Sequence, residues 1–197
     1  MRYSSDHKQE TRTRLLREAA REIRLKGPDR VAVAGVMRRA GLTHGGFYAH
    51  FGSKEALIAE AIGTMFEDAR SRFAGETVGD DPRAALAAYI EFYLSPGHRD
   101  ARDRGCPLAA IGSDVPRLPE AARERFARGL AALTERLAEA IMACGIERPD
   151  QEAASLVAEL VGALSLARAV RDSAESDSIL QQSAAALRRR LGLESAA

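Results

Sequence analysis

Cysteine, histidine and tryptophan are scarce in this 197-residue chain, which has two cysteines, four histidines and no tryptophan. Cys106 and Cys144 form no CxxC pair, and no histidine lies at the spacing of metal ligands. We therefore expect neither a disulfide framework nor a metal site, and both cysteines are predicted to be thiols. The sequence also gives no reason to expect a cofactor.

Long apolar runs are missing as well. No stretch reaches the roughly 18 to 20 uncharged apolar residues that a membrane-spanning helix needs. The first residues, MRYSSDHKQETR, lack the apolar core of a secretory signal. The sequence thus predicts a cytoplasmic protein without a membrane partner.

Recognisable catalytic motifs are also absent. The sequence contains no GxSxG, HExxH, CxxC or phosphate-binding loop, and no convincing Ser/His/Asp arrangement. We therefore predict that the protein is not an enzyme, and an all-α enzyme is kept only as a disfavoured alternative.

The residues that are abundant favour helices. Ala, Leu, Arg and Glu dominate the composition, while aromatic residues make up 5% of it. Apolar residues recur at spacings of three and four, which predicts an all-α fold of about nine helices without a convincing strand. The stretches with helical periodicity are residues 11–26, 33–40, 43–50, 54–73, 82–94, 119–144, 151–171 and 177–191.

Charge is distributed unevenly along the chain, although its net value is only +1. Residues 1–55 hold 12 Lys and Arg against 6 Asp and Glu, which leaves 17 against 22 in the remainder. A basic end is a candidate surface for nucleic acid, although basic faces are often only solvated.

Two short helical stretches at this basic end form a helix-turn-helix pattern. Residues 33–40 and 43–50 are separated by a turn that contains Gly41, and the amphipathic stretch 11–26 precedes them. This order predicts a DNA-binding helix-turn-helix at about residues 31–50.

The sequence AGLTHGGFYAHFGSKEAL at residues 40–57 closely resembles the signature of the TetR (tetracycline-repressor) family of bacterial transcriptional regulators. The resemblance extends over about residues 8–68. It implies a three-helix DNA-binding domain there, and a helical ligand-binding and dimerisation domain over residues 69–197. The matching positions are Ala40 and Gly41 at the turn, Phe47, Tyr48, His50 and Phe51 in the recognition helix, and Ser53, Lys54, Glu55, Ala56 and Leu57 at the start of the next helix.

The resemblance implies specific contacts to the DNA backbone. Tyr48 and His50 would bind phosphate oxygens, and Lys54 would add a cation at the first turn of the following helix. Thr43 can donate to a phosphate or to a base. Outside this motif, a surface aromatic would be the favoured interpretation of Tyr48, and an N-cap that of Thr43.

Base recognition then falls to the remaining exposed positions of the recognition helix, which are His44, Gly45, Gly46 and Ala49. A glycine in a helix costs about 0.5 to 1 kcal/mol relative to alanine, so the glycine pair weakens the helix. The pair would, however, allow the backbone to approach the DNA closely. DNA shape is the alternative source of specificity.

The resemblance further implies a homodimer through the last two helices, at about residues 151–171 and 177–191. Such a dimer binds a palindromic operator in double-stranded DNA, and a repressor released by a small-molecule inducer is the favoured function. An architectural DNA-binding protein without a ligand is the alternative.

A pocket for the inducer is expected among the middle helices. Each aromatic or aliphatic candidate could equally be an ordinary core residue. The candidate pocket residues are Phe66, Tyr89, Phe92, Tyr93, Cys106, Ile111 and Phe126.

Cys106 is singled out by its surroundings in DRGCPLAAIG. Pro107 fits the first turn of a helix, which would place Cys106 at the N-cap near Arg102 and Arg104. Such a position stabilises a thiolate, so Cys106 is a candidate sensor of thiol-reactive inducers. The alternative is a small buried thiol.

Overall fold

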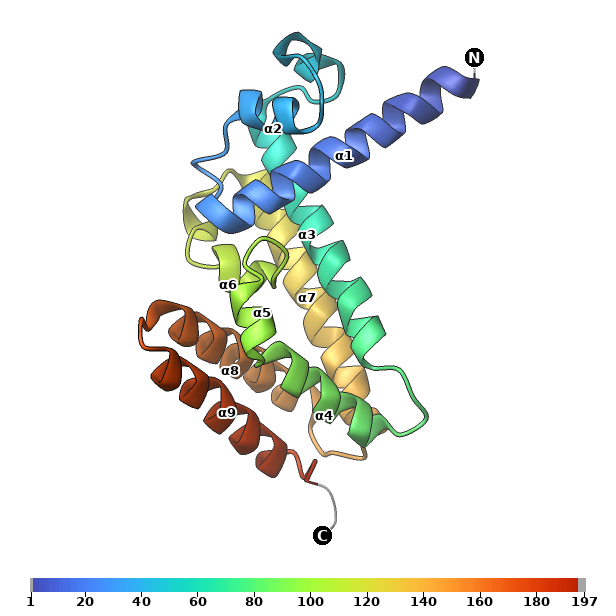
Figure 1. The fold of residues 1–197 in the computed structure, drawn as a ribbon. Helices are drawn as coiled ribbons and strands as arrows, with labels where there is room; N and C mark the ends of the chain where they lie inside the picture. Colours follow the sequence, from blue (N-terminus) through green and yellow to red (C-terminus); the bar gives the residue numbers. More distant parts are fainter. Residues whose placement is uncertain (1, 195–197) are drawn as a thin grey trace. The chain divides into compact units, whose positions relative to one another are not determined.

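The computed structural model describes residues 2–194, with the side chains of residues 2–5 and of residue 44 outside the described part. These residues form nine α-helices and two 3-10 helices, with no strand among them, so the predicted all-α fold is confirmed (Figure 1). None of the described helices combines the length and the apolar character that crossing a membrane requires.

The chain divides into two compact units. The first unit consists of residues Met1–Asp68 and Cys106–Gly129, and the second unit consists of residues Ala69–Gly105 and Leu130–Ala197. Segment 106–129 therefore groups with the N-terminal residues, whereas the predicted functional division assigned it to residues 69–197. The assignment of DNA binding and ligand binding to domains stays a prediction.

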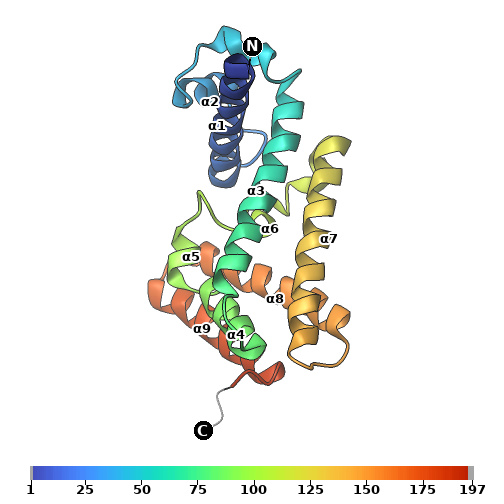
Figure 2. The same cartoon turned by 90° about the vertical axis from the view of Figure 1, so that its right-hand side faces the viewer.

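The first unit is built around helix α1 (Arg2–Lys26), which begins well before the predicted residue 11. Its apolar stripe at Leu15, Ala19 and Ile23 is almost completely buried. Helix α2 lies beside α1 (Figures 1 and 2). The other elements of this unit are α2 (Val33–Arg39), η1 (His44–Ala49), the first part of α3 (Lys54–Glu76), α6 (Pro107–Ile111), η2 (Val115–Arg117) and the start of α7 (Glu120–Ala143).

The second unit contains the hairpin of α8 (Pro149–Ala169) and α9 (Ser173–Arg190), which pack side by side in both views (Figures 1 and 2). Leu156, Leu160 and Leu164 of α8 are buried, as are Leu180 and Leu187 of α9. Helices α4 (Pro82–Tyr93) and α5 (Pro96–Asp100) and the ends of α3 and α7 complete this unit.

Local capping signals explain several helix ends, and one capping interpretation is wrong. The Asp81 side chain accepts from the backbone N–H of Arg83 and so caps α4, which suits the Asp-Pro pair in the sequence. Asp150, a residue type that suits an N-cap before the periodic stretch 151–171, instead lies inside α8, which begins at Pro149 after Arg148 at φ 54°. Helix α4 ends before Ser95-Pro96-Gly97, and the Ser95 hydroxyl then caps the short helix α5.

Candidate nucleic-acid interface

The turn after α2 is closed by a left-handed glycine. Gly41 has φ +73°, a conformation that side chains rarely adopt, and its N–H donates to the Arg38 carbonyl at 3.0 Å. The Leu42 N–H donates to the Met37 carbonyl at 2.9 Å. These bonds end α2 and turn the chain into the next element.

The recognition element is a 3-10 helix, His44–Ala49, rather than the α-helix expected from its periodicity. Its flanking bonds span three residues: Gly46 N–H donates to the Thr43 carbonyl at 3.2 Å, and His50 N–H to the Phe47 carbonyl at 2.9 Å. The two glycines have low helix propensity, which agrees with this short, tight form.

Aromatic residues anchor this 3-10 helix. Phe47 and Phe51 are both 3% exposed, as predicted, and their ring centroids lie 5.8 Å apart. Tyr48 meets Phe47 edge-on at 5.2 Å but is itself 74% exposed. The Tyr48 ring therefore packs against Phe47, while most of the Tyr48 side chain is exposed to solvent.

The predicted DNA contacts lie together on η1 and on the first turn of α3. The side chain of His44 lies outside the described residues. Thr43, Gly45, Tyr48 and Ala49 are exposed, while Gly46, His50 and Lys54 are partly exposed. This exposure leaves the positions accessible, and their contacts to DNA stay a prediction.

His50 can offer only part of its ring to DNA. Its Nδ1 atom is buried and has no hydrogen-bond partner among the described residues. Burial, followed by the positive charges of Lys8 and Arg12, lowers the pKa of His50 below its ordinary value. A neutral ring with Nδ1 as the unprotonated nitrogen leaves Nε2–H as the donor for a phosphate.

Lys54 has a structural role that the sequence did not reveal. Its Nζ donates to the carbonyl oxygen of Asp29 at 3.0 Å, which links the start of α3 to the loop before α2. The ammonium group has three donors, so this bond uses one of them. Ser53 caps α3 as predicted, accepting from the Ala56 N–H at 3.1 Å.

A carboxylate of α1 fixes the orientation of α2. The Glu22 side chain is 5% exposed and pairs with Arg39 Nη2 at 2.6 Å and with Lys26 Nζ at 2.7 Å. Burial raises the pKa of Glu22, but hydrogen bonds and charge from Lys26 and Arg39 bring it below its ordinary value. Arg39 also pairs with Glu18 at 3.1 Å. The spacing of Glu22 and Lys26 is a sequence signal for their pair, whereas nothing local points to Arg39.

The predicted pocket residues fall into both units. In the first unit, Ile111 is buried and Phe66 meets Phe126 edge-on at 5.4 Å. In the second, Tyr89 and Tyr93 are buried with their ring centroids 6.0 Å apart. A shared ligand pocket stays a prediction.

Cys106 lies where the sequence places it, at the N-cap of α6 before Pro107. The residue is 6% exposed and in no disulfide, whereas Arg102 and Arg104 are exposed. Its role as a sensor stays a prediction. Cys144 is also a buried thiol, and burial raises its pKa.

Phe92, the remaining pocket candidate, stacks on the ring of His98 at a centroid distance of 5.3 Å. Its side chain is partly exposed, unlike that of His98, which is buried. Phe92 therefore helps to enclose this histidine.

Two family models match the chain. A model described as "Bacterial regulatory proteins, tetR family" matches residues 15–61, and one described as "Tetracyclin repressor-like, C-terminal domain" matches residues 82–186. Among curated proteins, the "Uncharacterized HTH-type transcriptional regulator YdgC" of Bacillus subtilis is 32% identical over 182 residues, covering 79% of this chain and 91% of that protein.

Solved structures share the fold. A TetR transcriptional regulator from Chloroflexus aurantiacus has a TM-score of 0.77 at 28% identity, over 95% of this chain and 96% of that one. The reduced form of NemR from E. coli has a TM-score of 0.80 at 21% identity, over 91% of this chain and 96% of that one. At that lower identity, the similarity to NemR shows the fold alone.

Proposed function

Because the chain belongs to the TetR family of DNA-binding transcriptional regulators, we propose that it is a homodimeric repressor released from a palindromic operator by an inducer. The observation that carries the proposal is the surface of η1. Its aromatic anchors are buried, while Thr43, Gly45, Tyr48 and Ala49 are exposed in a segment with excess positive charge. Exposed donors around a short recognition element suit contacts to phosphates and to the major groove.

The α8–α9 hairpin supports the proposed dimer. Leu166 of α8 is 61% exposed although it is large and apolar. A Cβ added at Gly162 would meet no atom within 4 Å, so this helix presents an open surface there. A two-fold dimer would place two recognition elements about 34 to 36 Å apart, which matches half-sites one DNA turn apart.

An inducer must bind the DNA-free conformation better than the DNA-bound one, because equal affinity for both would change nothing. A small molecule among the predicted pocket residues is the first candidate. A thiol-reactive compound acting on Cys106 is the second, and its attack requires local opening because the residue is buried.

Tyr48→Phe is the sharpest test of DNA binding, because the Tyr48 hydroxyl is exposed and the ring itself stays on its anchor. A hydrogen bond from a neutral donor to a charged phosphate contributes about 1.5 to 3 kcal/mol. Affinity for a DNA fragment from upstream of the protein's own gene should therefore fall at least about tenfold. The free energy of unfolding should not change. Fluorescence anisotropy and urea unfolding measure the two quantities.

Lys54→Ala should lower the salt dependence of DNA binding by about one counterion. Arg136→Ala is the control, because this exposed arginine lies in α7, outside the predicted DNA contacts and outside the α8–α9 hairpin. Equal affinity for unrelated DNA would favour the architectural alternative. Unchanged affinity in Tyr48→Phe would refute the assignment of η1 to the DNA surface.

A further inference from the structure

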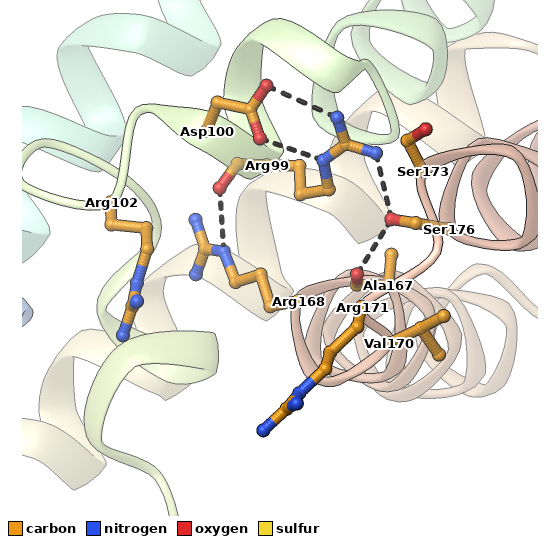
Figure 3. Close-up of a pocket in the computed structure, with 9 residues that line it drawn as sticks. All are labelled: Arg99, Asp100, Arg102, Ala167, Arg168, Val170, Arg171, Ser173 and Ser176. Atoms are coloured by element: carbon orange, nitrogen blue, oxygen red, sulfur yellow. Dashed lines mark hydrogen bonds and ion pairs between the residues drawn. The ribbon is translucent and has the colours of Figure 1, made fainter.

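A cavity of about 230 Å³ in the second unit is bordered by α5, the loop after it, the end of α8 and the start of α9 (Figure 3). Its lining is unusually basic. Arg99, Arg102, Arg168 and Arg171 border the cavity, and Asp100 is the one carboxylate among its lining residues. Several positive charges around one cavity repel one another, and a bound anion would reduce that repulsion.

Arg99 is already neutralised within the protein. Its Nε and Nη2 donate to the Asp100 carboxylate at 2.8 and 3.2 Å. Its Nη1 donates to Asp177 at 2.5 Å and to the Ser176 hydroxyl at 2.8 Å. Ser176 in turn donates to the Ala167 carbonyl at 2.7 Å, so this arginine links α5, α8 and α9.

Arg168 lines the cavity and is held in place by two backbone carbonyl groups. Its Nε donates to the Arg99 carbonyl at 3.0 Å, and its Nη2 to the His98 carbonyl at 3.1 Å. A Cβ on Gly105 would lie 2.8 Å from Nη2, so a side chain at this position would displace the guanidinium. The two carbonyl oxygens orient the guanidinium, and the Arg168 charge contributes to the lowered pKa of His98 after the larger effect of burial.

Arg102 and Arg171 reach the same cavity from two different loops. Both are exposed, and neither side chain has an ion pair or hydrogen bond among the described residues. In Figure 3 the Arg102 side chain lies on the same side as the Arg168 guanidinium, whereas the Arg171 side chain extends downwards from the end of α8. The cavity lining therefore includes two arginine side chains without a partner among the described residues, Arg102 and Arg171, and a third, Arg168, that carbonyl oxygens orient.

Arg99 is bound to both Asp100 and Asp177, whereas the side chains of Arg102 and Arg171 have no ion pair among the described residues. These two arginines therefore leave positive charge beside a cavity large enough for a compact molecule. Guanidinium groups present a planar fork of donors that matches carboxylate and phosphate oxygens.

We propose that this arginine cavity binds a small organic anion carrying a carboxylate or a phosphate group. Arg168 supplies the fixed donor, and Arg102 and Arg171 close on the anion from the loops on either side. The bound anion would connect α5 to the α8–α9 hairpin. Its effect on DNA release rests on the proposed function, whereas anion binding itself does not.

Isothermal titration calorimetry tests the site directly, with inorganic phosphate and malonate as separate probes. Potassium chloride keeps the ionic strength constant. The unmodified protein should bind at least one probe saturably, and the tighter probe identifies the preferred group. The Arg102→Gln/Arg171→Gln variant should lose affinity at least about tenfold, as two charge-assisted contacts are removed.

Arg104→Gln is the matched control, because it removes a 72% exposed arginine from the same loop that does not line the cavity. Its affinity should stay within about twofold of the unmodified protein. Arg171→Lys, which keeps the charge and loses the fork, should show an intermediate loss and remains informative if the double variant fails to fold.

No saturable heat with either probe would overturn the proposal, as would equal losses in the double variant and in Arg104→Gln. A double variant that binds phosphate normally but dissociates in sedimentation would assign these arginines to contacts between copies, and would also overturn it. Operator binding is measured separately, so a failure to bind DNA would contradict the proposed function without affecting the calorimetry.

Discussion

Lowering the pH from about 7 to about 5 should destabilise the protein through the buried imidazole of His98. The residue is 3% exposed, and its Nδ1–H donates to the Tyr93 carbonyl at 2.7 Å. Phe92 stacks on one face of the ring at 5.3 Å, and the Tyr93 ring meets it edge-on at 4.8 Å. A proton added to this ring would place a charge among aromatic groups and beside Arg168.

The magnitude follows from the pKa of this group. Burial first, and then the charges of Arg168 and Arg72, lowers the pKa of His98 to about 4, although the bond to Tyr93 acts in the opposite direction. In the unfolded chain the pKa is about 6.5, so the unfolded state binds more protons between these values. Stability is therefore complete above about pH 6.5 and decreases as the pH falls towards 4. Between about pH 7 and 5 the loss is about 2 kcal/mol.

Urea unfolding followed by circular dichroism measures this loss at both pH values. His98→Asn removes the titrating ring, while its amide N–H can still donate to the Tyr93 carbonyl. The variant should lose about 2 kcal/mol less than the unmodified protein over the same interval. His7→Asn is the control because His7 is exposed. The lowered pKa of Glu22 affects stability at more acidic pH, because that contribution is lost as the pH falls from the ordinary carboxylate pKa towards the lowered one.

An equal pH dependence in His98→Asn and in the unmodified protein would refute this reasoning. That result would mean that the folded protein accepts a proton on His98 at little cost, through solvent entry or a movement of α5. A smaller pH dependence in His7→Asn would assign the effect to a different histidine.

Two further predictions concern glycines. Gly46→Ala should lower operator affinity at least about tenfold, while the free energy of unfolding stays equal or rises by up to about 1 kcal/mol, because the new Cβ meets only the Met37 methyl, at 3.7 Å. Gly41→Ala, at φ +73°, should instead lower the free energy of unfolding in the same urea assay. Parallel losses of affinity and stability in Gly46→Ala would mean that this glycine has a structural role. Gly129→Ala should cost about 1 to 2 kcal/mol in urea unfolding despite its better helix propensity, because its Cβ would lie 2.3 Å from the Phe66 ring. Phe66→Leu should restore part of that loss, and a stable Gly129→Ala single variant would contradict the close approach.

Much of the local structure from α2 to the start of α3 could be predicted because its signals are local. Gly41 marks the turn, Ser53 marks the start of α3, and the spacing of Phe47 and Phe51 marks the buried side of η1. Each signal involves residues within one turn of one another, where propensity and capping act directly. The 3-10 form of η1 was not predicted, since period alone does not distinguish so short a piece from an α-helix.

The features that escaped prediction depend on residues far apart in the sequence. Lys54 bonds a carbonyl 25 residues away, and Arg99 bonds Ser176 across 77 residues. Periodicity places each side chain on a helix but cannot tell which distant group it will meet. For the same reason the sequence indicated only a DNA contact for Lys54 and gave no sign of the arginine cavity.

The structure also changes how the recognition element is expected to work. Gly45 and Gly46 add no side-chain chemistry, and the buried Nδ1 of His50 removes one donor or acceptor from the surface. Among the described side chains in and beside this element, the hydroxyl-bearing Thr43 and Tyr48 are exposed and His50 is partly exposed. Such a surface suits phosphate contacts better than base recognition, so we expect specificity to depend on backbone approach and DNA shape. Affinity would then depend on accurate placement of η1, and we expect the Lys54 bond between the start of α3 and the loop before α2 to contribute to that placement.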